Sequence, residues 1–187
     1  MKQKLTTKKI VLTGLLAALT VVGSTLRIVM PISIAGTTAF HLGNIFCALS
    51  GILLGPWLGG LAAGIGSAFY DMFVNPAYFD EAWLTFLMKG AYGVAAGLIA
   101  WAGTKNWQYG KATVAACAGA ITYALLYLAK SYFLGGILKQ GLTPDAAWFV
   151  VLEKLPATIF NAVVAILVAP ILAVTIRKAL AKARLFD

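Results

Sequence analysis

The chain has 187 residues, of which 61% are hydrophobic and only 11% are charged, and its fifteen Lys and Arg outnumber six Asp and Glu. Soluble domains carry roughly 25% charged residues, so this composition excludes a water-soluble globular protein. Its basic residues lie at the ends of apolar runs and not on one polar domain, which favours contact with an anionic membrane surface over nucleic-acid binding.

Apolar runs separated by Pro, Gly or charge predict an all-α integral membrane protein. The expected fold is a bundle of six transmembrane helices that forms a single domain over residues 1–187. The predicted spans cover residues 10–30, 41–55, 57–74, 84–103, 112–135 and 150–176. The first run continues past Val22 without a small-residue cleavage site, so we expect it to remain as a helix and not to be removed as a signal peptide.

The charges fall into two sets at opposite ends of these spans. One set is almost purely basic and has the terminal Asp187 as its only acid; it comprises Lys2, Lys4, Lys8, Lys9, Lys105, Lys111, Arg177, Lys178, Lys182 and Arg184. The positive-inside rule assigns this side to the cytoplasm. Both termini are therefore predicted to be cytoplasmic, in a multi-pass protein of the bacterial cytoplasmic membrane surrounded by the lipid bilayer.

The second set of charges predicts a polar pocket on the outer side. Arg27, Asp71, Lys89, Lys130 and Glu153 lie at similar depth in five different predicted helices. Charges inside or bordering a membrane are costly unless they are paired or hydrated. Snorkelling to the headgroups is the competing interpretation for each Lys or Arg, but the two carboxylates are too short for it.

Tyrosines at the same depth are candidates for the pocket wall. Tyr123 and Tyr127 are one helical turn apart, on the same side of the fifth span as Lys130, where they would stack on a flat ligand. An interfacial aromatic belt or ordinary packing is the alternative. Tyr70 ends the glycine-rich third span, and Tyr78 lies in the outer loop that follows.

Polar side chains complete the predicted site. His41 has no Cys or His partner and so makes a poor metal site, which leaves contact with a ligand or bracing of the loop. Asn161 lies deep in the sixth span and needs a partner there, either another helix or a ligand. The candidate substrate-binding residues are Arg27, His41, Asn44, Tyr70, Asp71, Asn75, Tyr78, Lys89, Tyr123, Tyr127, Lys130, Glu153 and Asn161.

Motifs for catalysis are missing from the sequence. It contains no phosphate-binding loop, no His-Glu-x-x-His, no Gly-x-Ser-x-Gly and no Cys-x-x-Cys. We therefore predict no catalytic residue, no metal and no cofactor, and expect the protein not to be an enzyme. Two alternatives stay open, a small intramembrane enzyme that uses Asp71 or Glu153 and a membrane scaffold without a ligand.

Short motifs spread along the whole chain resemble those of the substrate-binding S component of energy-coupling factor (ECF) vitamin transporters, in the riboflavin-type and related branch. They are Gly14-Leu-Leu-Ala-Ala18 after a Lys-rich start, Phe40-His-Leu-Gly-Asn44, Leu53-Leu-Gly-Pro56, Gly59-Gly-Leu-Ala-Ala-Gly-Ile-Gly-Ser67, Phe86-Leu-Met-Lys-Gly90 followed by Gly93, Phe160-Asn161 and Ala169-Pro170. The likeness rests on the order and spacing of these motifs along the chain.

The resemblance implies a subunit that captures a vitamin or vitamin precursor from outside and docks on a transmembrane coupling subunit driven by two ATPase subunits. Gly14-x-x-x-Ala18 matches the family's Ala-x-x-x-Ala docking pattern, and Gly60 and Gly64 extend the expected small-residue surface. Cobalamin, pyridoxine-type compounds, hydroxymethylpyrimidine and riboflavin all remain open as ligands. The general look of the sequence gives a slight preference to the cobalamin or pyridoxine/pyrimidine type.

Overall fold

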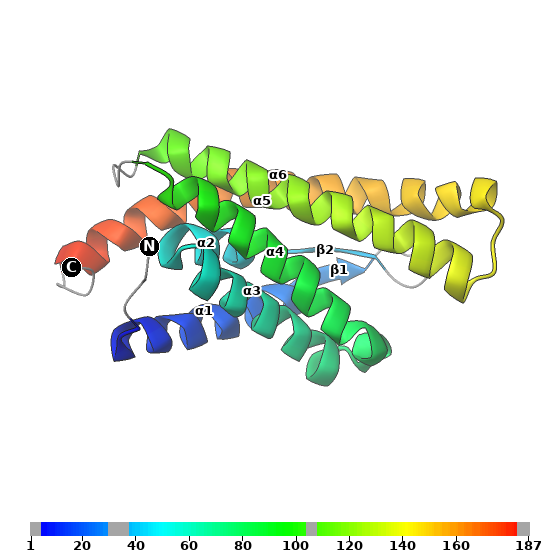
Figure 1. The fold of residues 1–187 in the computed structure, drawn as a ribbon, viewed down its shortest axis with the longest axis horizontal. Coiled ribbons are helices and arrows are strands. Elements are labelled where there is room, and N and C mark those ends of the chain that lie inside the picture. Colours follow the sequence, from blue (N-terminus) through cyan, green and yellow to red (C-terminus); the bar gives the residue numbers. More distant parts are fainter. Residues whose placement is uncertain (1–4, 30–37, 104–107, 183–187) are drawn as a thin grey trace.

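A computed structural model describes residues 5–29, 38–103 and 108–182 and shows an all-α bundle with one short hairpin (Figure 1). Its α-helices are α1 (Thr7–Thr25), α2 (Gly43–Leu54), α3 (Pro56–Phe69), α4 (Ala82–Trp101), α5 (Tyr109–Lys130) and α6 (Pro144–Lys182). The segments Thr7–Thr25, Pro76–Trp101, Tyr109–Lys139 and Pro144–Leu180 are long and apolar enough to span a bilayer. The six helices confirm the predicted all-α membrane bundle.

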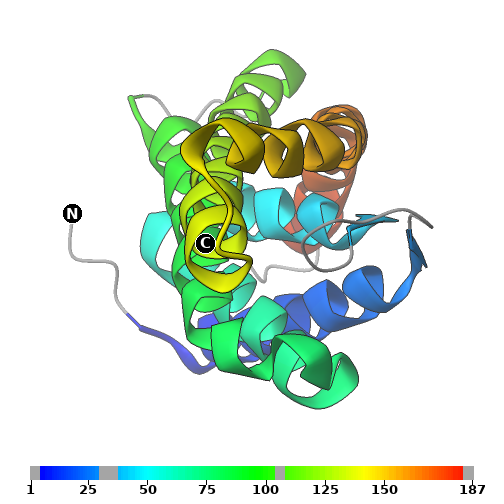
Figure 2. The same ribbon diagram turned by 90° about the vertical axis from the view of Figure 1, so that its right-hand side faces the viewer.

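The first helix is shorter than predicted because the chain turns into a β-hairpin. Helix α1 ends at Thr25, and strand β1 (Arg27–Val29) pairs antiparallel with β2 (Ala39–His41), with Arg27 opposite His41. The predicted span 10–30 extends past the end of α1, and the predicted span 41–55 begins at the last residue of β2. Short runs containing β-branched residues suit strands as well as helices, and periodicity does not separate the two. In Figure 2 the hairpin lies between α1 and α6, and β2 contacts both helices.

Two of the helices widen into π-helix at their ends. Helix α3 continues as η1 (Tyr70–Val74), a 3-10 helix η2 (Pro76–Glu81) leads into α4, and α5 continues as η3 (Ser131–Lys139). A backbone hydrogen bond of 2.9 Å, from the Asn75 N–H to the Tyr70 carbonyl, closes one of these wide turns. The wider turn rotates the side chains that follow it, and such turns are common at functional sites. Both π-helices lie at the same end of the molecule as the hairpin.

Helices α2, α3 and α4 are in backbone contact at three glycines. A Cβ atom added to Gly93 would lie 2.6 Å from the Gly59 carbonyl oxygen and 2.9 Å from the Gly60 Cα, and Gly51 contacts both Gly59 and Gly93. Small residues give membrane helices this close approach, because van der Waals packing replaces the hydrophobic effect between helices in lipid. Helix α2 is buried almost throughout and forms the centre of the bundle.

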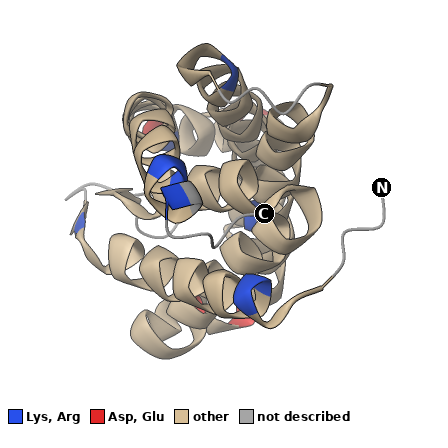
Figure 3. Cartoon of the chain, turned by 90° about the vertical axis from the view of Figure 1, so that its left-hand side faces the viewer, with Lys and Arg blue, Asp and Glu red and all other residues tan. Residues whose placement is uncertain are grey.

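One end of the long axis of the molecule carries described bases only, and the described acids lie toward the other end. The beginning of α1, the beginning of α5 and the end of α6 lie together at the left of Figure 1, and Figure 3 views this end. Its described bases are Lys8, Lys9, Lys111, Arg177, Lys178 and Lys182, whereas the described acids Asp71, Asp80, Glu81, Asp145 and Glu153 belong to segments of the other half. The assignment of the basic end to the cytoplasm stays a prediction. Lys2, Lys4, Lys105, Arg184 and Asp187 lie outside the described residues.

Candidate ligand-binding site

A cavity of about 430 Å³ lies among the hairpin, the π-helices and the beginning of α6. Twelve of the thirteen side chains proposed from the sequence line it. They are Arg27, His41, Asn44, Tyr70, Asp71, Asn75, Tyr78, Lys89, Tyr123, Tyr127, Lys130 and Asn161. The structure thus brings together residues from nearly every segment of the chain, and their role in binding stays a prediction.

Glu153 is the one proposed residue that the structure leaves out of the cavity lining. The next residue, Lys154, lines the cavity instead and is buried. One residue corresponds to about 100° of rotation around a helix, which is enough to turn a side chain from one face to another. Lys154 lies two helical turns before Asn161, so their spacing of seven residues was a signal in the sequence that placed them on one face.

Other lining residues were not proposed from the sequence. The polar ones are Ser24, Thr38, Ser67, Glu81, Thr85, Ser131, Lys139, Gln140, Lys154 and Thr158. Several of them belong to the hairpin region or to a π-helical segment. Sequence periodicity predicts neither of these structures. Glu81, Lys139 and Lys154 are charged residues near the outer ends of the predicted spans 84–103, 112–135 and 150–176, so the position of their charges alone would have found these three.

Three tyrosines form a stack beside the cavity. The ring centroids of Tyr92 and Tyr123 are 5.9 Å apart, and those of Tyr123 and Tyr127 are 5.6 Å apart with an interplanar angle of 20°. The Lys89 ammonium lies 3.8 Å from the Tyr123 ring centroid and donates a hydrogen bond to the Asn44 side-chain oxygen. Tyr92 is fully buried, so Tyr123 and Tyr127 are the members of the stack that a ligand would meet.

Asn161 holds the hairpin against α6. Its side-chain oxygen accepts a hydrogen bond from the His41 N–H, and its side-chain nitrogen donates to the Ala39 carbonyl, both at 2.9 Å. Both backbone groups belong to β2, whose outer edge would otherwise be left without partners. The amide therefore braces the hairpin, with a strand as its partner and not the helix or ligand that the sequence suggested.

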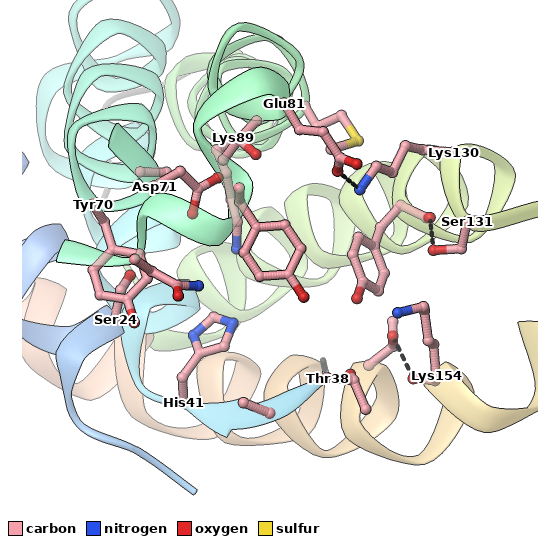
Figure 4. Close-up of a pocket in the computed structure, with 18 of the residues that line it drawn as sticks. Ser24, Thr38, His41, Tyr70, Asp71, Glu81, Lys89, Lys130, Ser131 and Lys154 are labelled. Atoms are coloured by element: carbon pink, nitrogen blue, oxygen red, sulfur yellow. Dashed lines mark hydrogen bonds and ion pairs between the residues drawn. The ribbon is translucent and has the colours of Figure 1, made fainter. Parts of the chain in front are cut away.

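His41 is a neutral hydrogen-bonding group that faces the cavity (Figure 4). Its burial, together with the Lys89 and Arg27 cations, lowers the pKa of the imidazole to about 3. The Gly43 N–H donates to Nδ1 over 3.2 Å, so the ring proton lies on Nε2. The Nε2–H makes no hydrogen bond to the residues that the structure describes, so it can donate to a ligand acceptor.

The depressed pKa of His41 predicts acid sensitivity. Because the folded pKa lies below the usual 6.5, the stability from the neutral form is complete above pH 6.5 and is lost as pH falls toward 3. We expect the free energy of unfolding to drop by about 2 kcal/mol between pH 7 and pH 5 from this group. Denaturation of the detergent-purified protein at both pH values measures it, and His41→Gln is expected to flatten the profile. Parallel profiles for both proteins would contradict the assignment.

Glu81 ties η2 to the end of α5. One carboxylate oxygen pairs with the Lys130 ammonium and the other pairs with that of Lys139. The exposed fractions of the side chains are 10% for Glu81, 16% for Lys130 and 47% for Lys139, so the first pair is the shielded one. In Figure 4 the Glu81 and Lys130 pair forms one wall of the cavity.

Removal of the Glu81 charge is expected to cost more than removal of either partner. Glu81→Gln leaves two ammonium groups facing each other in a partly shielded site, and we expect a loss of about 2 kcal/mol in unfolding free energy. Lys139→Gln breaks a half-exposed pair and is expected to cost about 0.5 kcal/mol or less. Denaturation of both variants in detergent tests the order, and equal losses would show that the carboxylate does not hold the cluster together.

The cavity lining combines aromatic rings with polar side chains, which suits the binding of a small molecule. Among the described residues no three His, Cys, Asp or Glu side chains gather as a metal site would require. A bundle of apolar helices with a polar, aromatic cavity at one end defines a membrane protein that binds a small molecule.

The chain belongs to the family of ECF-type riboflavin transporter S components, whose model matches residues 4–179. It is also similar to an uncharacterized protein in the gap 3′ region of Pyrococcus woesei, with 33% identity over 119 residues that cover 64% of this chain and 74% of that protein. The protein is therefore a multi-pass membrane component of a transporter and not an enzyme. The slight preference for a cobalamin or pyridoxine/pyrimidine ligand has no support in this family.

Proposed function

We propose that this S component captures a ring-bearing vitamin of the riboflavin type from outside the cell and hands it to a separate coupling subunit driven by two ATPase subunits. The observation that carries the proposal is the cavity, in which the Tyr123 and Tyr127 rings stand beside a ring of polar side chains. Stacked aromatic rings bind a flat conjugated ligand, and surrounding polar groups fix its orientation.

The size of the cavity supports a ligand of one to three fused rings. Its volume of about 430 Å³ lies in the usual range for small-molecule sites. Cobalamin, with a corrin macrocycle and a nucleotide loop, is much bulkier than this space. Riboflavin matches both the family and the aromatic wall, whereas pyridoxine and hydroxymethylpyrimidine are single rings that would use less of the cavity.

The separation of charge supports entry from outside. The end of the bundle without the cavity carries the described bases of the α1, α5 and α6 ends, and such bases favour the cytoplasmic leaflet. The cavity then lies at the outer face. The proposed direction of capture follows from this orientation.

Helix α1 offers the docking surface for the coupling subunit. Gly14 and Ala18 are exposed, and a Cβ atom added to Gly14 would meet no atom within 4 Å. Gly60 and Gly64 are buried against α4, where an added Cβ would meet Val94 and Phe86 respectively. These two glycines belong to the internal contact between α3 and α4, so the surface expected from the sequence is reduced to the α1 face.

Mass spectrometry of small molecules released from the detergent-purified protein tests the proposed function. We expect one vitamin-like compound with a conjugated ring in about equal molar amount to the protein. Protein from cells grown with an isotope-labelled vitamin should release the labelled compound. A protein that carries no such compound and binds none of the candidate vitamins would contradict the proposal.

A further inference from the structure

The cavity carries more positive than negative side chains. Five basic side chains line it against two acidic ones: Arg27, Lys89, Lys130, Lys139 and Lys154 against Asp71 and Glu81. A cation shielded from bulk water costs free energy unless it is paired or hydrogen-bonded. The partners of each cation therefore indicate which cation in the site is not already paired within the protein.

Most of these cations have partners inside the protein. Lys130 and Lys139 share the Glu81 carboxylate. Lys89 has the Asn44 oxygen and the Tyr123 ring, and the Arg27 guanidinium lies 5.6 Å from the Tyr70 ring centroid. These interactions account for the cations that α4, α5, η3 and β1 contribute to the cavity.

Lys154 is different, because its ammonium makes no hydrogen bond or ion pair within the part of the chain that the structure describes. The residue is only 5% exposed. Figure 4 shows its side chain reaching from α6 into the cavity, across from the Glu81 and Lys130 pair. Thr158, one turn along α6, donates its hydroxyl to the Lys154 backbone carbonyl over 2.8 Å, and this hydrogen bond does not involve the ammonium.

Groups next to Lys154 connect it to the aromatic wall. Thr38 lies beside Lys154 in Figure 4, and Thr38 and Tyr127 both line the cavity, with the Thr38 side chain close enough to the Tyr127 hydroxyl to interact with it. Tyr127 stacks on Tyr123. A ligand ring against these tyrosines would thus place a substituent within reach of the Lys154 ammonium.

We infer that the ligand carries an anionic group, a carboxylate or a phosphate, that binds Lys154 while its ring lies against Tyr127. This inference rests on the proposed function and narrows it to the anionic members of the ring-bearing vitamins. A ligand anion would form the direct ion pair that the Lys154 ammonium does not make within the described residues, and lysine binds carboxylate or phosphate as a point charge.

Matched pairs of neutral and anionic compounds test the inference. The pairs are riboflavin with riboflavin 5′-phosphate, pyridoxine with pyridoxine 5′-phosphate, and nicotinamide with nicotinate, titrated into the detergent-purified protein. We expect the anionic member of at least one pair to bind about ten- to a hundredfold more tightly, the usual effect of a charge-assisted hydrogen bond. Preference within the phosphate pairs or the carboxylate pair identifies the source of the anion.

Variants at Lys154 connect that preference to one side chain. Lys154→Met is expected to bring the affinities for the two members of the preferred pair to within about threefold of each other. The affinity for the neutral member should stay the same, since only the point charge is removed. Lys154→Arg should retain the preference, and so should Lys178→Met, which removes an exposed lysine at the opposite end of the bundle. Equal or tighter binding of the neutral members by the unmodified protein would overturn the inference.

Thermal stability gives a second measurement that needs no ligand. If the Lys154 ammonium lacks a partner inside the protein, Lys154→Met removes an uncompensated buried charge, so the ligand-free variant should melt at a higher temperature than the unmodified protein. A lower melting temperature would show that Lys154 has a structural partner and would overturn the inference. If none of the six compounds bound, the proposed function would fail, while the melting temperatures would still decide the role of Lys154.

Discussion

Alanine in place of Gly93 is expected to lower the free energy of unfolding by about 3 kcal/mol. The added Cβ would lie 2.6 Å from the Gly59 carbonyl oxygen and 2.9 Å from the Gly60 Cα, and these are backbone atoms that no side-chain rotation relieves. Helices α3 and α4 must therefore move apart, which also opens their contacts with α2. Overpacking a tight site costs about 1–3 kcal/mol and sometimes more. Gly93→Leu is expected to yield no folded protein.

A matched glycine separates this packing effect from helix propensity. Gly14 lies inside α1 with no atom within 4 Å of an added Cβ, so Gly14→Ala should gain up to about 1 kcal/mol from propensity alone. Thermal and chemical denaturation of both variants in the same detergent provides the comparison. A Gly93→Ala protein as stable as the Gly14→Ala protein would show that the three helices are not in backbone contact.

The position of the site could be predicted from the sequence because charges in a membrane are costly. Asp71, Lys89 and Lys130 lie in different helices, and only a shared polar cavity makes their common depth favourable. Family resemblance was not needed for this step. The same argument explains why aromatic residues at that depth, such as Tyr123 and Tyr127, also line the cavity.

The hairpin and the π-helical turns could not be predicted from the sequence. Strand β1 depends on pairing with β2 and on the bonds from Asn161 to β2, and these contacts join residues far apart in the chain. The π-turns of η1 and η3 insert extra residues without any change in composition. Local sequence patterns predict neither the long-range pairing nor the π-turns. The positions of Thr38 and Ser131 in the cavity wall are therefore known only from the structure.

The packing partners of the small residues also could not be predicted from the sequence. Gly14 and Gly60 both belong to four-residue small patterns, yet the first is exposed and the second is buried against α4. A small-residue pattern predicts a close helix contact but does not identify the partner. The tertiary arrangement separates the internal contact from the face that remains for another protein.

Tryptophan in place of Ala18 is expected to abolish vitamin uptake while the protein still folds and binds its ligand. Ala18 is exposed on α1 one turn after Gly14 and does not line the cavity, so a bulky side chain there meets neither the core nor the ligand. It would instead hold a coupling subunit away from the small-residue face, and close helix contacts in membranes do not tolerate such bulk. Copurification of the coupling and ATPase subunits, together with uptake of the vitamin by cells, measures the effect.

The control for this experiment places the same side chain on a different exposed face. Ile121 is 60% exposed on α5, so Ile121→Trp adds bulk to the membrane surface away from α1 and should leave assembly and uptake unchanged. Ligand binding by the purified Ala18→Trp protein should match that of the unmodified chain, because the cavity is untouched. Normal assembly of the Ala18→Trp protein would show that the docking surface is not on α1. Loss of ligand binding would show that the substitution disturbs the fold and not the docking step.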